Sequence, residues 1–394
     1  MTQPTLDFDN TEIAFAHLDD RALKRSAWLF GLMNKPYLVK YGSVLGLWAV
    51  ENKLPFAERV VKATIFDQFV GGRTLFDSQK AIEHLARYGV MTILDYGAEA
   101  KETEADFNHT MNENLRAIDF ASRSSHIPVV STKITGLARF GLLERIQNPE
   151  RLSREDLSEY RNALKRIDAI CYHAATKGVS IYIDAEESWI QKTIDHIVWL
   201  MMRAYNRQRP VVYNTFQMYR SDRLEFLSHS FDRAREEGFI LGAKLVRGAY
   251  MEKEAQRAAE HGYENPINPD KAATDDLYNT GLRFCLQHIE HIGLCNASHN
   301  AASNLLQVEL MAQFNIPRDH PHTIFSQLYG MSDNLTFNLA KAGFRAAKYM
   351  PYGQVSDVIP YLIRRAQENT SVTGDAGREY SLILKEMKRR GLRT

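Results

Sequence analysis

Cysteine is scarce in this chain of 394 residues: only Cys171, Cys285 and Cys295 are present, too far apart for a CxxC motif. This spacing gives no zinc pattern and no framework of structural disulfides, so we expect a reducing compartment. Long apolar runs are also missing, since no stretch approaches the ~18 residues that a membrane-spanning helix needs. Excess charge is absent too. The formal net charge of +1 gives no reason to expect a nucleic-acid partner.

Targeting signals, repeats and low-complexity tracts are lacking as well. The first residues, MTQPTLDFDNTE, are acidic and polar, unlike a signal or transit peptide, so we expect a cytoplasmic protein. What is present is an ordinary globular composition, with 44% hydrophobic and 25% charged residues. The length suffices for one large domain of about 250–300 residues plus an accessory part.

Residues 1–88 read as a mostly helical region. Asp19 to Met33 and Phe56 to Phe69 carry apolar residues at helical spacing, and Gly71-Gly72 ends this pattern. The segment from Ser26 to Phe56 is rich in Trp, Leu and Tyr. Such a segment either packs against the rest of the protein or touches a membrane surface, and we favour packing.

From residue 90 onward, short β-branched or apolar runs alternate with amphipathic stretches. Eight such runs are present: Val90–Tyr96, Val129–Ile134, Val179–Asp184, Val211–Phe216, Ile240–Val246, Leu294–Ala297, His322–Phe325 and Ala346–Tyr349. The stretches between them include Glu102–Arg123, Arg154–Lys177, Ile190–Gln208, Lys271–Ile289 and Ala301–Phe314. This order predicts an α/β fold, a (β/α)8 TIM-type barrel with an N-terminal helical region. A doubly wound open sheet is the alternative, but no GxGxxG turn follows an early strand.

The predicted domains are therefore residues 1–88, a helical region; residues 89–375, the barrel; and residues 376–394, a charged C-terminal helix or tail. In such a barrel, function resides at the carboxyl ends of the strands. Nearly all of these ends are polar: Asp95-Tyr-Gly-Ala-Glu99, Lys133, Asp184-Ala-Glu-Glu187, Thr215 with Gln217, Lys244 with Arg247, Ser298-His-Asn300, Gln327 and Tyr349. Polar ends on all eight strands indicate a site rather than isolated structural ion pairs.

Two of these ends carry opposite charges on neighbouring strands. Lys133 and Asp184 are placed to pair at the mouth of the barrel, which would keep the lysine charged. A buried lysine without such a partner would be a Schiff-base nucleophile, and an aldolase-type enzyme built on Lys133 is thus an alternative. No histidine lies at a spacing that supports a metal site, so we expect none.

The last long helix before the tail has an unusual polar face. In the segment YLIRRAQEN, the positions Tyr361, Arg364, Arg365 and Glu368 share one side of a helix. Two neighbouring guanidiniums suit a carboxylate or phosphate. A solvated face with weak Arg–Glu pairs is the other interpretation.

Taken together, the segments DYGAE, Lys133, IDAEE, KLVRGAY, ASHN, QLYGM, YMPYG and YLIRRAQEN resemble the flavin-dependent proline dehydrogenase family, in its order and over residues 90–370. NTFQMY and KLVRGAY are more similar to its monofunctional, mitochondrial-type branch. The resemblance implies a distorted (β/α)8 barrel with FAD at its mouth, and oxidation of L-proline to 1-pyrroline-5-carboxylate by hydride transfer to the flavin. It also implies a membrane quinone as electron acceptor. The expected location is therefore the cytoplasm, with peripheral contact at the inner face of the membrane.

The resemblance also implies roles for individual residues. Arg364 and Arg365 would bind the proline carboxylate, and Lys133, Asp184, Tyr349 and Tyr361 would complete the substrate pocket. The residues that would hold FAD are Gln217, Lys244, Val246, Arg247, Gly248, Ala249, Tyr250, Lys271, Ser298, His299, Asn300, Gln327 and Glu368. Thr215 competes with Gln217 for one of these roles. In the family, a tyrosine at the position of Tyr349 accompanies proline as substrate, and a smaller residue accompanies hydroxyproline. A barrel that only binds or scaffolds is the non-enzymatic alternative.

Overall fold

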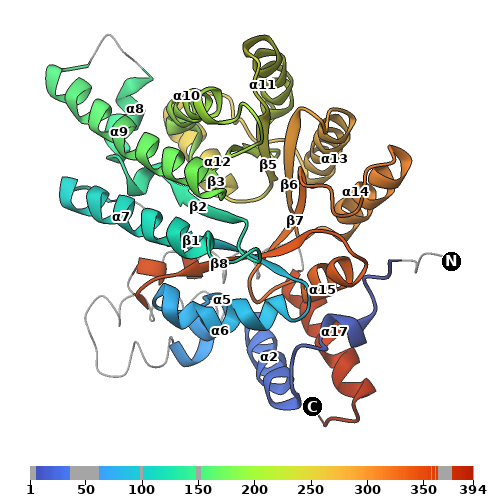
Figure 1. Ribbon diagram of the computed structural model, residues 1–394. Coiled ribbons are helices and arrows are strands. Elements are labelled where there is room, and N and C mark those ends of the chain that lie inside the picture. Colours follow the sequence, from blue (N-terminus) through green and yellow to red (C-terminus); the bar gives the residue numbers. More distant parts are fainter. Residues whose placement is uncertain are drawn as a thin grey trace. The chain divides into compact units, whose positions relative to one another are not determined.

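The computed structural model of the protein describes residues 6–35, 62–97, 101–147, 152–355, 357–359, 361–362 and 375–393. Within these residues, eight strands form a closed barrel in the order β1 to β8 (Figure 1). The pairing is parallel between β1 and β8 and between successive strands from β2 to β7. The strands are β1 (Met91–Tyr96), β2 (Val129–Lys133), β3 (Ser180–Asp184), β4 (Val212–Gln217), β5 (Leu241–Val246), β6 (Ile292–Ala297), β7 (Thr323–Leu328) and β8 (Ala346–Tyr352). The closed order confirms the predicted (β/α)8 fold and excludes the open sheet.

All eight predicted strand runs are confirmed, but three strands are longer than their apolar runs. β6 begins earlier, at Ile292, and β7 and β8 continue to Leu328 and Tyr352. The apolar run of β7 ends before Ser326 and Gln327, which are buried polar residues of that strand. Gln327 and Tyr349, which the sequence suggested as strand ends, therefore lie inside their strands.

The chain forms two compact units, and the first comprises Ala98–Ser326. Its helices are α7 (Glu104–Ala121), α8 (Phe140–Ile146), α9 (Arg154–Lys177), α10 (Ser188–Tyr205), α11 (Arg223–Glu237), α12 (Met251–His261), α13 (Lys271–Gln287) and α14 (Ala301–Gln313). A short 3-10 turn, η2 (Ile134–Gly136), follows β2. The predicted bounds of α9 are confirmed because the ends are well marked. Ser153 and Asp156 form a capping box, and Gly178 ends the helix in the left-handed region.

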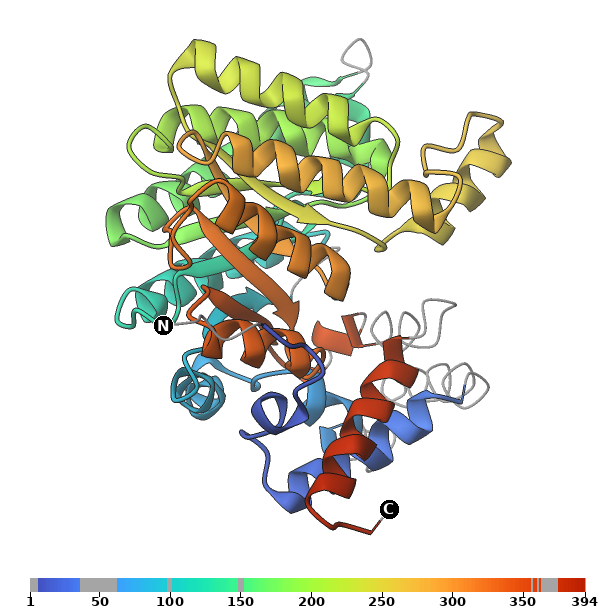
Figure 2. The same cartoon turned by 90° about the vertical axis from the view of Figure 1, so that its right-hand side faces the viewer.

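The second compact unit comprises Met1–Gly97 and Gln327–Thr394. Besides β1 and β8 it contains α1 (Thr11–Ala14), α2 (Asp20–Met33), a π-helix η1 (Lys62–Phe66), α5 (Asp67–Phe69), α6 (Leu75–Ala86), α15 (Asp333–Lys341) and α17 (Asp375–Arg389). In both views α2 and α17 lie side by side (Figure 1, Figure 2), and Phe30, Leu362 and Ile383 share one buried cluster. This confirms the helix expected over Asp19 to Met33, whereas most of Ser26 to Phe56 lies outside the described residues.

The predicted domain boundaries at residues 88 and 375 stay a prediction. Among the described residues, no helix is both long enough and apolar enough to cross a bilayer.

Candidate active site

A buried ion pair lies inside the barrel. The Nζ atom of Lys244 on β5 is 2.5 Å from Oδ1 of Asp184 on β3, and both side chains are largely shielded from solvent. Since β4 separates these two strands in the sheet, their side chains meet across the interior rather than along a ladder. Ser131 on β2 donates a hydrogen bond of 3.1 Å to the same carboxylate oxygen. The carboxylate is thus fixed from two strands.

Lys133 was expected to pair with Asp184, and the register places the two residues directly opposite each other on β2 and β3. The ion pair of Asp184 with Lys244 was not foreseen. Sequence spacing identifies neighbouring strands, but it does not reveal which side chains meet across the inside of a barrel.

Glu186, just beyond β3, is a buried carboxyl group that the sequence-based set of site residues omitted. It accepts hydrogen bonds from the backbone N and the hydroxyl of Thr135, at 3.1 and 2.5 Å. Burial raises the pKa of Glu186 to about 7, while these hydrogen bonds and the charge of Lys133 oppose that rise. The polar run after β3 was the available signal. Glu186 ties the turn that follows Lys133 to the end of β3.

Thr215 and Gln217, the two candidates for one role in FAD binding, differ in the hydrogen bonds that their side chains form. The Thr215 hydroxyl donates to the carbonyl oxygen of Ile183 at 2.7 Å. The Gln217 amide nitrogen donates to the carbonyl oxygen of Glu186 at 2.7 Å and to the hydroxyl of Tyr219 at 2.8 Å. Its Oε1 atom is buried and has no hydrogen-bond partner among the described residues. Gln217 therefore has an acceptor to offer to a ligand, which favours it over Thr215.

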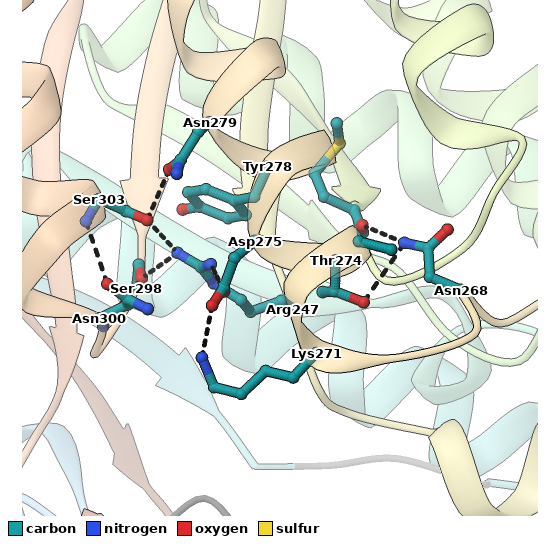
Figure 3. Close-up of polar contacts among 12 residues, drawn as sticks. Arg247, Asn268, Lys271, Thr274, Asp275, Tyr278, Asn279, Ser298, Asn300 and Ser303 are labelled. Atoms are coloured by element: carbon teal, nitrogen blue, oxygen red, sulfur yellow. Dashed lines mark hydrogen bonds and ion pairs between the residues drawn. The ribbon is translucent and has the colours of Figure 1, made fainter.

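A polar network surrounds Arg247, which directly follows β5 (Figure 3). Its guanidinium donates to Asp275 on α13, and through Nη2 to the hydroxyls of Ser298 and Ser303, at 3.0 and 2.7 Å. The ring of Tyr278 lies 3.8 Å from the guanidinium carbon, a cation–π contact. Residues of two successive strand–helix units, β5–α13 and β6–α14, therefore fix one cation.

Further predicted site residues lie near this network. Lys271, the first residue of α13, forms an ion pair with Asp275, and the backbone N of Asn300 donates to Ser298 at 3.1 Å. His299, which lies between Ser298 and Asn300 in the sequence, is partly buried. Asp275 and Ser303 were missed, because Lys271 and Asp275 in sequence look like an ordinary surface pair one helical turn apart.

The loop after Arg247 is shaped by glycine. Gly248 has a φ of 87°, and a Cβ built there would meet nothing within 4 Å. A side chain would be strained at that φ, so glycine is required by the backbone rather than by crowding. Ala249 follows it, Tyr250 is buried, and Val246 closes β5.

The other compact unit holds the remaining predicted residues. Tyr349 is buried in β8, and its carbonyl oxygen accepts a hydrogen bond of 2.8 Å from the backbone N of Tyr329. Tyr361 is buried as well, and Gln327 accepts a hydrogen bond of 2.8 Å from Thr336 on α15. Arg364, Arg365 and Glu368 lie outside the described residues.

Comparison with known proteins identifies relatives along most of the chain. The family model described as Proline dehydrogenase matches residues 78–378. Proline dehydrogenase 1, mitochondrial, of Dictyostelium discoideum is 33% identical over 84% of this chain and 65% of its own length. Proline dehydrogenase 2, mitochondrial, of Arabidopsis thaliana is 30% identical over 98% of this chain and 92% of its own length. Hydroxyproline dehydrogenase of Xenopus laevis is 32% identical over 93% of this chain and 86% of its own length.

Solved structures share the fold. The crystal structure of proline utilization A from Bdellovibrio bacteriovorus, inactivated by N-propargylglycine, superimposes with a TM-score of 0.72 at 19% identity. The match covers 94% of this chain and 40% of that chain.

Proposed function

This chain belongs to the proline dehydrogenase family, and we propose that it oxidises L-proline to 1-pyrroline-5-carboxylate with FAD as hydride acceptor. The observation that carries the proposal is the family match over residues 78–378, a range that includes every strand of the barrel. FAD supplies the hydride acceptor that no side chain can provide. We further propose a quinone as the next electron acceptor, with peripheral membrane contact.

The residues at the barrel mouth fit such a cofactor. Arg247 and Lys271 provide two cations for its diphosphate, and Gly248 leaves the backbone open to close approach. Gln217 offers a buried acceptor without a partner among the described residues, as a flavin N–H group would require. Ser298, His299 and Asn300 would bind further along the same molecule.

The side chains of the chain itself would bind and orient the substrate. Arg364 and Arg365 would bind the proline carboxylate through bidentate, charge-assisted hydrogen bonds. Lys133, Asp184 and Tyr349 would line the pocket and hold the ring in a reactive position. Lys244 is a buried cation beside Asp184, and a cation in a shielded interior stabilises negative charge that develops next to it.

The visible spectrum of the purified full-length protein tests this function. We expect a yellow protein with bound flavin whose absorbance near 450 nm is lost when L-proline is added without air. Arg364→Met and Arg365→Met should keep their flavin but need roughly tenfold to a hundredfold more proline, since each loses a charge-assisted contact. A colourless protein that takes up no added FAD would contradict the proposal. A borohydride-trapped substrate adduct on Lys133 would favour the aldolase alternative instead.

A further inference from the structure

We propose that Asp275 is a positioning residue for cofactor binding, an inference that rests on the proposed function. Its carboxylate joins Arg247 and Lys271 into one fixed pair of cations, which receives the diphosphate of FAD. Asp275 itself would not touch the cofactor. Its role is to hold two long cationic side chains, from two different elements, in one place before FAD arrives.

The geometry of the carboxylate supports this role. Oδ1 of Asp275 accepts from Nη1 of Arg247, and Oδ2 accepts from Nζ of Lys271 (Figure 3). Each oxygen therefore serves one cation. Arg247 directly follows β5, whereas Lys271 begins α13, so the carboxylate links the end of a strand to the start of a helix.

The two cations differ in how much they depend on Asp275. Arg247 has further supports, because Ser303 and the ring of Tyr278 also contact its guanidinium. Lys271 has a side chain that is 63% exposed, and an exposed lysine is flexible and strongly hydrated. Ordering such a side chain at the moment of binding costs conformational entropy. Asp275 supplies that order in advance.

The Arg247 guanidinium also has a donor to spare. Its Nε atom is buried and has no hydrogen-bond partner among the described residues, although both Nη atoms are engaged. A buried donor without a partner is costly, so such an atom indicates a missing acceptor. An oxygen-rich anion bound beside Arg247 is the kind of group that would satisfy it.

An electrostatic role and a positioning role of Asp275 predict opposite effects on FAD binding when its carboxylate is removed. If Asp275 acted only through its negative charge, it would repel a diphosphate, and its loss would tighten FAD binding. If it positions the two cations, its loss would weaken binding, because the cations would no longer be held together. The sign of the effect therefore distinguishes the two roles.

The experiment measures FAD release from the full-length holoenzyme, through the fluorescence of the flavin set free on graded dilution. Asp275→Asn removes the charge and keeps the shape, and we expect its Kd for FAD to rise about tenfold. Asp276→Asn is the matched control, since Asp276 is the next residue of the same helix and is exposed to solvent. The control should keep its Kd within about twofold or bind slightly more tightly. Equal Kd values for the two variants, or tighter binding by Asp275→Asn, would overturn the proposal.

Two additional variants separate positioning from a loss of folding. Lys271→Met changes an exposed side chain, so the fold is not at risk, and we expect a Kd several times higher than that of the wild type. In the Arg247→Met, Lys271→Met background, Asp275→Asn should no longer weaken binding, because no cations remain to be held. A loss that persists there would overturn the proposal. If the wild type bound no FAD, the proposed function would fail; if it bound FAD and Asp275→Asn matched it, this inference alone would fail.

Discussion

Tyr349 is the residue whose size should decide which substrate the site accepts. Its side chain is buried at 6% exposure in β8, and the proposed function places it against the far edge of the substrate ring. A 4-hydroxyl group on the substrate ring would have to enter that space, and overpacking costs about 1–3 kcal/mol. We expect kcat/KM for L-proline to exceed that for trans-4-hydroxy-L-proline by roughly tenfold or more.

The Tyr349→Ser variant tests this expectation. The smaller side chain should reduce the preference, mainly through lower activity toward proline, because the cavity left behind weakens contact with the ring. Flavin content serves as the control, and it should stay unchanged. If the ratio of the two kcat/KM values were the same in variant and wild type, Tyr349 would only pack the strand.

At the level of residues, the sequence identified polar groups at the strand ends but not all of their partners. Lys133, Asp184 and Arg247 were recognisable because polar residues at strand ends face one mouth in a barrel. Lys244 was identified as a site residue but not as the partner of Asp184, and Asp275, the partner of Arg247, was not identified at all. They lie across the barrel interior or on the next helix, and strand order alone does not fix such contacts.

The loop between β7 and α15 is held by a cluster of buried charges. Asp333 lies 2.9 Å from Nε2 of His17 and 2.7 Å from Nζ of Lys348, whose side chain is only 1% exposed. The charges of Lys348 and His17 lower the pKa of Asp333 against the effect of burial. Ser332, with a φ of 50°, donates its backbone N–H to Glu379 of α17 at 2.8 Å. One loop thus anchors the N-terminal region, β8 and the last helix.

Asp333→Asn should destabilise this unit, because the buried Lys348 would lose the carboxylate that lies 2.7 Å from its Nζ atom. Removing one partner of a buried pair costs about 3–5 kcal/mol. Thermal unfolding measures the loss, and Asp333→Asn combined with Lys348→Met should recover part of it. Asp67→Asn is the control, since its pair with Arg25 is exposed and such pairs contribute about 0–1 kcal/mol. A small loss in Asp333→Asn would mean that the cluster does not hold the loop.

At the level of elements, regular patterns were predictable and buried polar segments were not. The helix over Arg154–Lys177 has a capping box and a terminal glycine, and its bounds follow directly from them. The end of β7 contains Gln327, whose burial depends on partners such as Thr336 elsewhere in the chain. Periodicity within a short window contains no information about those partners.

Across the whole molecule, two buried carboxyl groups should make stability fall as the pH rises. Burial raises the pKa of Glu186 in one unit and of Glu379 in the other, each to about 7 from an ordinary 4.5. The lowered pKa values of Asp222 and Asp333 act in a different pH range. These two groups contribute stability that is lost as the pH falls below about 4. Burial lowers the pKa of His84. Below pH 6.5, the ordinary value for histidine, this group makes stability rise with pH and so opposes the effect of the two carboxyl groups.

The Glu379→Gln variant isolates one of these two contributions. Between about pH 4.5 and 7 the folded protein keeps a proton on Glu379 that the unfolded chain has released, so stability declines over that interval, by about 3 kcal/mol at most. Glutamine can still accept the hydrogen bond from Ser332 but cannot ionise. We expect equal melting temperatures for variant and wild type near pH 5, and a higher one for the variant at pH 8.5. Glu155→Gln, at an exposed position, should show no such divergence. Parallel curves for Glu379→Gln and wild type from pH 5 to 8.5 would show that Glu379 is ionised throughout.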